Sequence, residues 1–146
     1  MIKTYVIDTN VLIQAPYAIE CFEENNLVLP LVVLEELDGL KKAEGEKGAN
    51  ARAAVRKLES YRQKGDLLQG VKLPGGGILR IEKNFVQVEL PQDIPDDKPD
   101  NRILKVCKGL AETEKEGQVI LVTKDIVLRL KAQILGCLLY TSDAAD

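Results

Sequence analysis

The sequence predicts an α/β fold of the three-layer α/β/α, Rossmann-like type, with a central, mainly parallel sheet of about five strands. Strand-like segments alternate with helical segments along the chain, as expected where helices connect parallel strands. The strand-like segments are also continuous apolar runs, of which residues 118–123 are the clearest. Strands of this kind are buried on both faces, so helices should cover both faces of the sheet.

The first half of the chain contains two of these strands and three helical segments. Residues 3–7 and 27–29 are the strand-like runs. Pro30 then occupies a helix start, where the missing N–H of proline is tolerated. The expected helices span residues 18–24, 31–42 and 46–65, and the last of them has an apolar stripe at helical spacing.

The second half begins with a glycine-rich loop and two strand-like pieces within residues 73–90. Residues 91–100 form a polar loop that is interrupted by prolines. The helix 101–112, the strand 118–123 and the helix 124–136 follow, and they complete the alternation of strands and helices.

The most restrictive feature of the composition is the absence of histidine from all 146 residues. It excludes Ser-His-Asp and Cys-His catalysis and every histidine metal ligand. The three cysteines lack CxxC spacing, which argues against a zinc site and a disulfide scaffold. The net charge of −3 argues against a basic nucleic-acid clamp. No segment reads as a signal peptide or membrane span, so we expect a cytoplasmic protein without a membrane partner.

Residues 137–146, CLLYTSDAAD, are interpreted apart from the rest of the chain. Their letters match the translation of a transposase sequencing adapter. We therefore expect a domain of residues 1–136 and an artefactual tail of residues 137–146. The alternative is a natural strand, CLLYT, with a polar end. No residue of this tail is used as a functional candidate.

Four carboxylates lie where the predicted strands lead into helices. Asp8 follows the first strand and is enclosed by two apolar runs, where a buried carboxylate needs a hydrogen-bond donor or a cation. Glu36 lies in the helix after the second strand, Asp100 opens the helix before residues 118–123, and Asp125 follows that strand. Ligands of parallel sheets bind beyond the carboxyl ends of the strands, so we expect all four at one edge. Helix capping remains an alternative for Asp100 and Asp125.

The helix 31–42 offers two adjacent glutamates, and its periodicity distinguishes them. Val33, Leu37 and Leu40 define the buried stripe of this helix. Glu36 lies at the edge of the stripe, whereas Glu35 points to the opposite side. We therefore expect Glu36, and not Glu35, near the site.

Clustered carboxylates need cations. Two carboxylates about 4 Å apart repel each other by roughly 4 kcal/mol at an effective dielectric constant of 20. Hard oxygen ligands without histidine or thiolate select Mg²⁺ or Mn²⁺, and such ions activate water for displacement at phosphorus. We expect Thr9 and Asn10 to help orient Asp8. The sequence has no GxxxxGK[ST] motif, which argues against a P-loop ATPase within this segment.

Four segments, in this order, resemble the motifs of the PIN-domain family of metal-dependent nucleases: VIDTNVLI, LPLVVLEELDGLKK, DNRIL and LVTKDIVLRLKA. Within that family the chain is most similar to the N-terminal PIN domains of PhoH-like ATPases, through FEENNLVLPLVVLEELDGLKK and EKGANARAAVRKL. The resemblance runs from Lys3 to about Gly136. It implies cleavage of single-stranded RNA by a metal-activated water, and a C-terminal P-loop ATPase domain in similar chains.

The resemblance assigns the family's acidic residues, as catalytic residues and metal ligands, to Asp8, Glu36, Asp100 and Asp125. It also implies that Asn10 and Thr123 are supporting polar residues. One departure is Ala49, because similar proteins usually have an arginine at this position.

Contacts to RNA phosphates are expected from a few cations near these motifs. Arg129 and Lys131 follow Asp125, and Arg52 lies on the helix 46–65. A solvated charged face is the alternative interpretation for each of them. With few aromatic residues, binding should depend on phosphates more than on bases. The sequence leaves the oligomeric state open, and a homo-oligomer is one of the states it allows.

Two other functions remain open at this stage. One is a catalytically weak PIN module that binds RNA or a partner and regulates an attached PhoH-type ATPase. The other is a phosphotransfer domain with Asp8 as nucleophile. It is disfavoured because the aspartyl-phosphatase pattern has a second aspartate where Asn10 stands.

Overall fold

The computed structural model describes residues 2–83, 85, 87–113 and 117–140. Within them a six-stranded sheet has the order β3-β4-β2-β1-β5-β6. Five strands run parallel, namely β1 (Thr4–Ile7), β2 (Asn26–Pro30), β4 (Ile78–Glu82), β5 (Val119–Val122) and β6 (Leu138–Leu139). The short β3 (Val71–Lys72) pairs antiparallel with β4.

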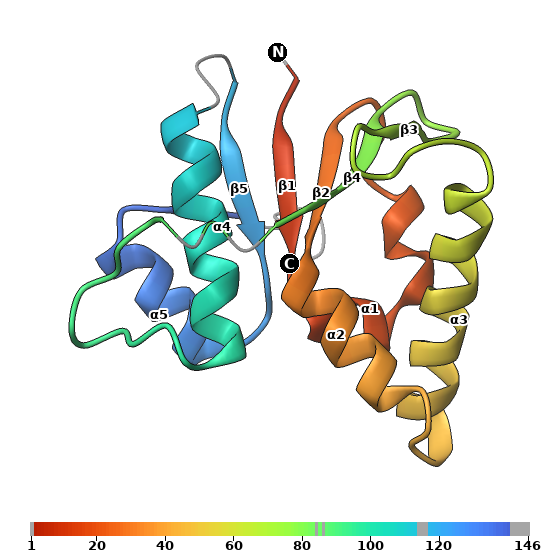
Figure 1. The fold of residues 1–146 in the computed structure, drawn as a ribbon, viewed down its shortest axis with the longest axis horizontal. Helices are drawn as coiled ribbons and strands as arrows, with labels where there is room; N and C mark the ends of the chain where they lie inside the picture. The colour runs from red at the N-terminus through yellow and green to blue at the C-terminus, as the bar shows by residue number, and fades with distance from the viewer. Residues whose placement is uncertain (1, 84, 86, 114–116, 141–146) are drawn as a thin grey trace.

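Helices lie on both sides of the strands (Figure 1). One side carries α4 and α5, and the other carries α1, α2 and α3, so the expected three-layer α/β/α fold is confirmed. The helices are α1 (Thr9–Gln14), α2 (Leu31–Leu40), α3 (Gly45–Arg62), α4 (Pro99–Thr113) and α5 (Ile126–Ile134), with a 3-10 helix at Pro16–Glu20.

The core is aliphatic and centred on the middle strands. Val6, Leu27 and Leu29 have no exposed surface, because β1 and β2 are covered by helices on both faces. The continuous apolar runs of the sequence reflect this two-sided burial. On α5, by contrast, four large apolar side chains face outward: Ile126, Val127, Leu130 and Ile134.

Two sequence predictions of local structure differ from the structure, and one helix was not predicted. That helix is α1, which residues 9–14 form directly after Asp8. The expected helix 18–24 is a 3-10 helix that begins at Pro16. Of the two strand-like pieces in residues 73–90, one is β4, and the described residues of the second form no strand.

The sheet has one strand more than the approximate five that were predicted. The two-residue β3 was not predicted, since so short a segment has no periodicity of its own. The strand β6 lies within the residues interpreted as a tail, and its Leu138 pairs with Ile120 of β5. Residues 141–146 lie outside the described part, and the interpretation of 137–146 as artefactual stays a prediction.

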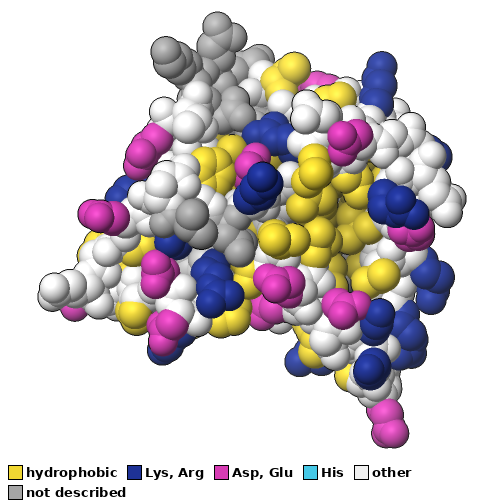
Figure 2. Space-filling view, viewed as in Figure 1, with side chains coloured by type: hydrophobic (Ala, Val, Ile, Leu, Met, Phe, Trp, Pro, Cys, Tyr) yellow, Lys and Arg dark blue, Asp and Glu magenta, His cyan; other side chains and the backbone are white. Residues whose placement is uncertain are grey.

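Charged side chains of both signs are interspersed on the face that Figure 2 shows, around an apolar area near its centre. This face therefore carries no continuous basic surface, in agreement with the acidic net charge. Among the described helices, none combines the length and the apolar content that crossing a bilayer would require.

Candidate active site

The strand β1 delivers Asp8 to the carboxyl edge of the sheet. Residue Ile7 is paired with Val122 of the neighbouring β5, and the N–H of Asp8 donates to the Val122 carbonyl at 3.1 Å. Asp8 therefore lies directly after the end of β1 and is still buried, with only 2% of its surface exposed. A carboxylate in this position needs polar partners.

Thr123 supplies one of these partners. Its hydroxyl donates to Asp8 Oδ2 at 2.7 Å, and it accepts the N–H of Asp125 at 3.1 Å. Thr123 is itself 4% exposed. The supporting role expected for Thr123 thus has a defined contact, which joins the ends of β1 and β5.

The pKa of the Asp8 carboxyl is raised, chiefly because burial disfavours its charged form. The hydrogen bond from Thr123 lowers this pKa, whereas the negative charges of Asp100 and Glu36 raise it. Two acidic side chains from distant parts of the sequence therefore act electrostatically on Asp8.

Glu36 is held by a contact that the sequence did not reveal. Its Oε1 accepts the hydroxyl of Thr9 at 2.6 Å, so the residue after Asp8 fixes the second carboxylate. Glu36 is half-buried and Glu35 is exposed, which confirms the prediction from the helix face. Thr9 was expected to orient Asp8, and its hydroxyl instead binds Glu36.

Asp100 lies in the first turn of α4, next to the fully buried Asn101. The Asn101 amide donates to the Pro95 carbonyl at 2.5 Å, and its Oδ1 accepts Lys131 Nζ at 2.9 Å. These two bonds tie the start of α4 to the preceding loop and to α5. The position of Asp100 follows from them.

These acidic residues line one cavity of about 380 Å³. It contains three of the four predicted carboxylates, together with the exposed Asn10. In the described part of the chain, no group of three or more His, Cys, Asp or Glu side chains is close enough as it stands to hold a metal ion. The full lining is Asp8, Thr9, Asn10, Glu36, Gly39, Leu40, Lys47 and Asp100.

Asp125 is not among the residues that line this cavity. It is the N-cap of α5, where its Oδ1 accepts the N–H groups of Val127 at 2.9 Å and Leu128 at 3.3 Å. This is the capping role that the sequence left open. The role of Asp125 as a metal ligand stays a prediction.

The three cations predicted to bind RNA are engaged within the fold. Arg129 donates to the Thr123 carbonyl at 3.1 Å and to the Tyr140 carbonyl at 3.4 Å. Lys131 donates to the Asn101 amide, as described above. Arg52 donates to the Lys41 carbonyl at 2.8 Å. Their roles in substrate binding stay predictions.

Lys47 is the functional candidate that the sequence reasoning missed. It lies in the first turns of α3 and lines the carboxylate cavity. A signal was present, since Lys47 precedes the buried Ala51 by four residues and so continues the apolar stripe of that helix towards the site.

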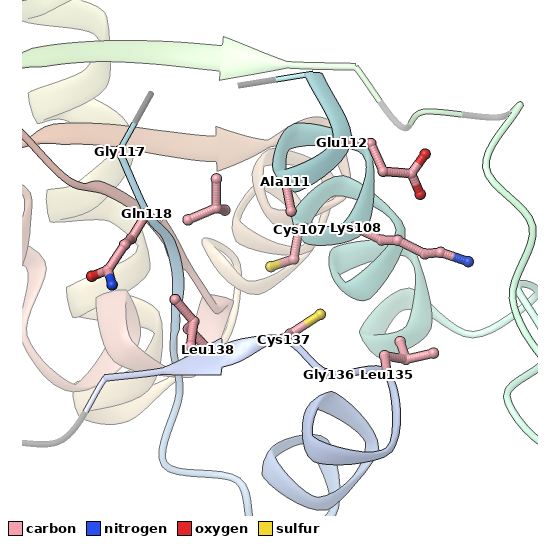
Figure 3. Close-up of a pocket in the computed structure, with 11 residues that line it drawn as sticks. Cys107, Lys108, Ala111, Glu112, Gly117, Gln118, Leu135, Gly136, Cys137 and Leu138 are labelled. Atoms are coloured by element: carbon pink, nitrogen blue, oxygen red, sulfur yellow. The ribbon is translucent and has the colours of Figure 1, made fainter. Parts of the chain in front are cut away.

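A second cavity, of about 440 Å³, lies between α4, the start of β5 and the segment after α5 (Figure 3). Cys107 projects into it from α4, and Cys137 lies opposite. Burial raises the pKa of both thiols, that of Cys107 well above its usual range. Neutral thiols are poor nucleophiles and metal ligands, so we assign no chemistry to this cavity.

Comparison with known proteins decides the family. A family model described as "PIN domain" matches residues 5–141. The chain belongs to the PIN-domain family. The similarity to PhoH-like proteins is also confirmed, since the curated relatives of this PIN domain bear the name Protein PhoH2.

Protein PhoH2 of Bacillus subtilis (strain 168) is 49% identical over 143 residues, which cover 94% of this chain and 32% of the relative. Protein PhoH2 of Mycolicibacterium smegmatis is 41% identical over 138 residues, covering 92% and 31%. The PIN domain thus spans about a third of the length of the curated relatives it matches.

A solved domain of a functionally unknown protein from Methanocaldococcus jannaschii has a TM-score of 0.56 and 22% identity. The match covers 99% of this chain and 94% of that domain. This likeness concerns the fold alone.

Proposed function

We propose that this PIN domain is a metal-dependent endoribonuclease that hydrolyses phosphodiester bonds of single-stranded RNA. The observation that carries the proposal is the convergence of Asp8, Glu36 and Asp100 on one cavity at the carboxyl edge of the sheet. The family assignment supports nuclease chemistry in general. The substrate and the need for metal belong to the proposal.

The donor set of the cavity fits Mg²⁺ or Mn²⁺. Asp8, Glu36 and Asp100 offer only oxygen ligands, and burial together with the negative charges of Asp100 and Glu36 raises the pKa of Asp8. These three residues would hold the ion, with Asp125 as the fourth acidic residue of the proposal. When bound, the ion supplies Lewis-acid activation of water and neutralises charge at the phosphate.

The protein's own groups set the positions of the carboxylates before substrate arrives. The hydroxyl of Thr123 orients Asp8, and the hydroxyl of Thr9 orients Glu36. Asn10 is exposed at the cavity rim, where its amide can bind the RNA backbone. Asp125 acts on the site through Thr123, whose side chain accepts the Asp125 N–H.

The test is cleavage of a labelled oligouridine by the full chain with Mg²⁺, Mn²⁺ or EDTA. Asp8→Asn should lower the cleavage rate by about a hundredfold or more, as expected for loss of a group that acts on the reacting atoms. Asp38→Asn is the matched control, because Asp38 is an exposed carboxylate on α2 that pairs with Lys41. Equal cleavage by wild type and Asp8→Asn, or cleavage unaffected by EDTA, would overturn the proposal.

A second candidate function is a catalytically weak module that binds RNA and regulates an attached PhoH-type ATPase. Two observations favour it. The described residues hold no ready-made group of three metal ligands, and the curated relatives are about three times as long as this chain. A folded protein that binds RNA but does not cut it with either Mg²⁺ or Mn²⁺ would favour this role.

A further inference from the structure

A second hollow, distinct from the cavity lined by Cys107 and Cys137, lies beside the carboxylate cavity. The hollow and the carboxylate cavity have lining residues in common. The hollow measures about 480 Å³ and lies where α1 meets the start of α3. Asn10 and Lys47 line both spaces. The remaining lining residues of the second hollow are Ile13, Gln14 and Glu46. A groove therefore leads from the carboxylates, past Asn10 and Lys47, onto the outer side of α1 and α3.

Lys47 stands at the junction of these two spaces. Among the described lining residues of either space it is the one Lys or Arg. Its side chain is exposed, and no described residue accepts a hydrogen bond or forms an ion pair with it within 4.0 Å. The ammonium group is therefore not used to neutralise Asp8, Glu36 or Asp100 directly, and it stays available to a ligand.

We propose that the RNA strand runs from the carboxylate cavity into the second hollow, and that Lys47 binds a phosphate next to the one that is cleaved. The inference rests on the proposed function, since it assigns a path to that same substrate. A phosphodiester entering a site with three carboxylates is repelled by them. A nearby ammonium group offsets this repulsion and fixes the strand's position.

The polar groups of the second hollow suit a nucleic-acid backbone. The amides of Asn10 and Gln14 can donate to phosphate or sugar oxygens. Glu46 is the one carboxylate there, and it limits the number of phosphates that this part of the groove accepts. We therefore assign one phosphate to Lys47, bound as to a point charge.

The test measures binding without cleavage. All proteins carry Asp8→Asn, so that fluorescein-labelled oligouridine stays intact in Mg²⁺, and affinity is followed by anisotropy over a range of salt concentrations. Loss of one phosphate contact in Lys47→Ala should weaken binding about three- to tenfold at low salt. It should also make the slope of log affinity against log salt shallower by about 0.7. Lys47→Arg should keep the slope of the parent.

Arg56→Ala is the matched control. Arg56 is exposed on the same helix, and nine residues of α-helix place it on the face opposite Lys47. This variant should bind as the parent does. Thermal unfolding of each protein confirms that the fold is retained, as expected for an exposed side chain.

The outcomes separate the inference from the proposed function. If the parent binds RNA and Lys47→Ala keeps its salt slope, the path through the second hollow is wrong and the proposed function stands. If Arg56→Ala changes the slope as much as Lys47→Ala, the effect is general charge and the inference falls. If neither the parent nor the wild-type protein in EDTA binds single-stranded RNA, both fail.

Discussion

The cationic side chains near the two sides of the carboxylate cavity differ in whether the protein itself provides their hydrogen-bond acceptors. On the α4–α5 side, Lys131 and Arg129 donate to acceptors of the protein itself, Asn101 and the Thr123 carbonyl. On the α3 side, Lys47 is exposed and has no partner among the described residues. The cations on the first side therefore have acceptors within the protein, whereas Lys47 has none among the described residues and is the cation that we propose binds substrate.

This difference shows that closeness to a motif in the sequence does not predict whether a cation is engaged within the fold. Residues 129 and 131 were chosen because they follow Asp125 within one helix. In the structure Arg129 donates to the carbonyls of Thr123 and Tyr140, and Lys131 donates to the Asn101 side chain. Lys47 is distant in sequence from Asp8 and Asp100, and the fold brings it to the cavity that they line.

The largest effect on the α4–α5 side should come from Asn101→Ala. The side chain has no exposed surface, and its loss leaves the Pro95 carbonyl and Lys131 without their partner. We expect a loss of about 2 kcal/mol in the free energy of unfolding. Urea denaturation measures it, with an unchanged slope m. A variant as stable as wild type would show that this side is not held together by Asn101.

Lys131→Met should have a smaller effect on stability and none on RNA binding. The variant keeps the length and the apolar part of the side chain but removes the donor to Asn101. We expect it to lose about 1 kcal/mol of stability and to keep the salt dependence of oligouridine binding. A shallower salt slope, of the size expected for Lys47→Ala, would show that RNA also contacts the α4–α5 side. The proposed difference between the two sides of the cavity would then be wrong.

Arg52→Ala separates the two roles on α3 itself. Arg52 donates to the carbonyls of Lys41 and Ala43, just past the end of α2, and its side chain is exposed. Removing it should cost about 0.5 kcal/mol, since exposed helix-end contacts contribute little, and should leave RNA affinity unchanged. Chemical denaturation and anisotropy on the same preparation test both expectations. A large loss of affinity would support the predicted role of Arg52 as a substrate contact.

The smallest expected effect concerns protonation of the cavity between the two sides. Because the pKa of Asp8 is raised in the folded protein, the folded state binds this proton more tightly than the unfolded state does. The resulting stability is present below the unfolded pKa and is lost as pH rises through the raised folded pKa. In metal-free buffer at pH 7, Asp8→Asn should therefore raise the unfolding midpoint, by no more than about 1 °C.

The control for this prediction is the same comparison in acid. Once Asp8 is protonated in both states, the advantage of the asparagine variant should disappear. Scanning calorimetry between pH 3 and about 8 measures the difference between the two proteins. A difference that does not change with pH would show that the pKa of Asp8 is not raised in the folded protein.

Much of the fold could be predicted from the sequence because its signals are local. Two-sided burial marks β1, β2 and β5, and helical periodicity places Glu36 on the inner edge of α2. The strand β3 could not be predicted, since its two residues become a strand only by pairing with β4. The helix α1 was missed because its apolar residues Val11, Leu12 and Ile13 are consecutive, as in a strand.

For the site, the residue types were predictable and the contacts were not. Asp8 could be identified because a carboxylate between apolar runs needs an explanation. The bond from Thr9 to Glu36 joins residues 27 positions apart, and no sequence period reports it. An aspartate directly after a strand and before a helix suits both helix capping and metal binding. The sequence alone could therefore not decide between these two roles for Asp125.

The bond between Thr123 and Asp8 spans 115 positions of the chain, and β1 needs β5 as a neighbour over its whole length. Pairing of such distant segments is slow to form in folding, because the closure entropy of a long loop opposes it. During synthesis, Asp8 leaves the ribosome early but lacks its strand neighbour until residues 119–123 have emerged. The acidic cavity is therefore incomplete until residues 119–123 have emerged, although Asp8 and Glu36 are translated much earlier.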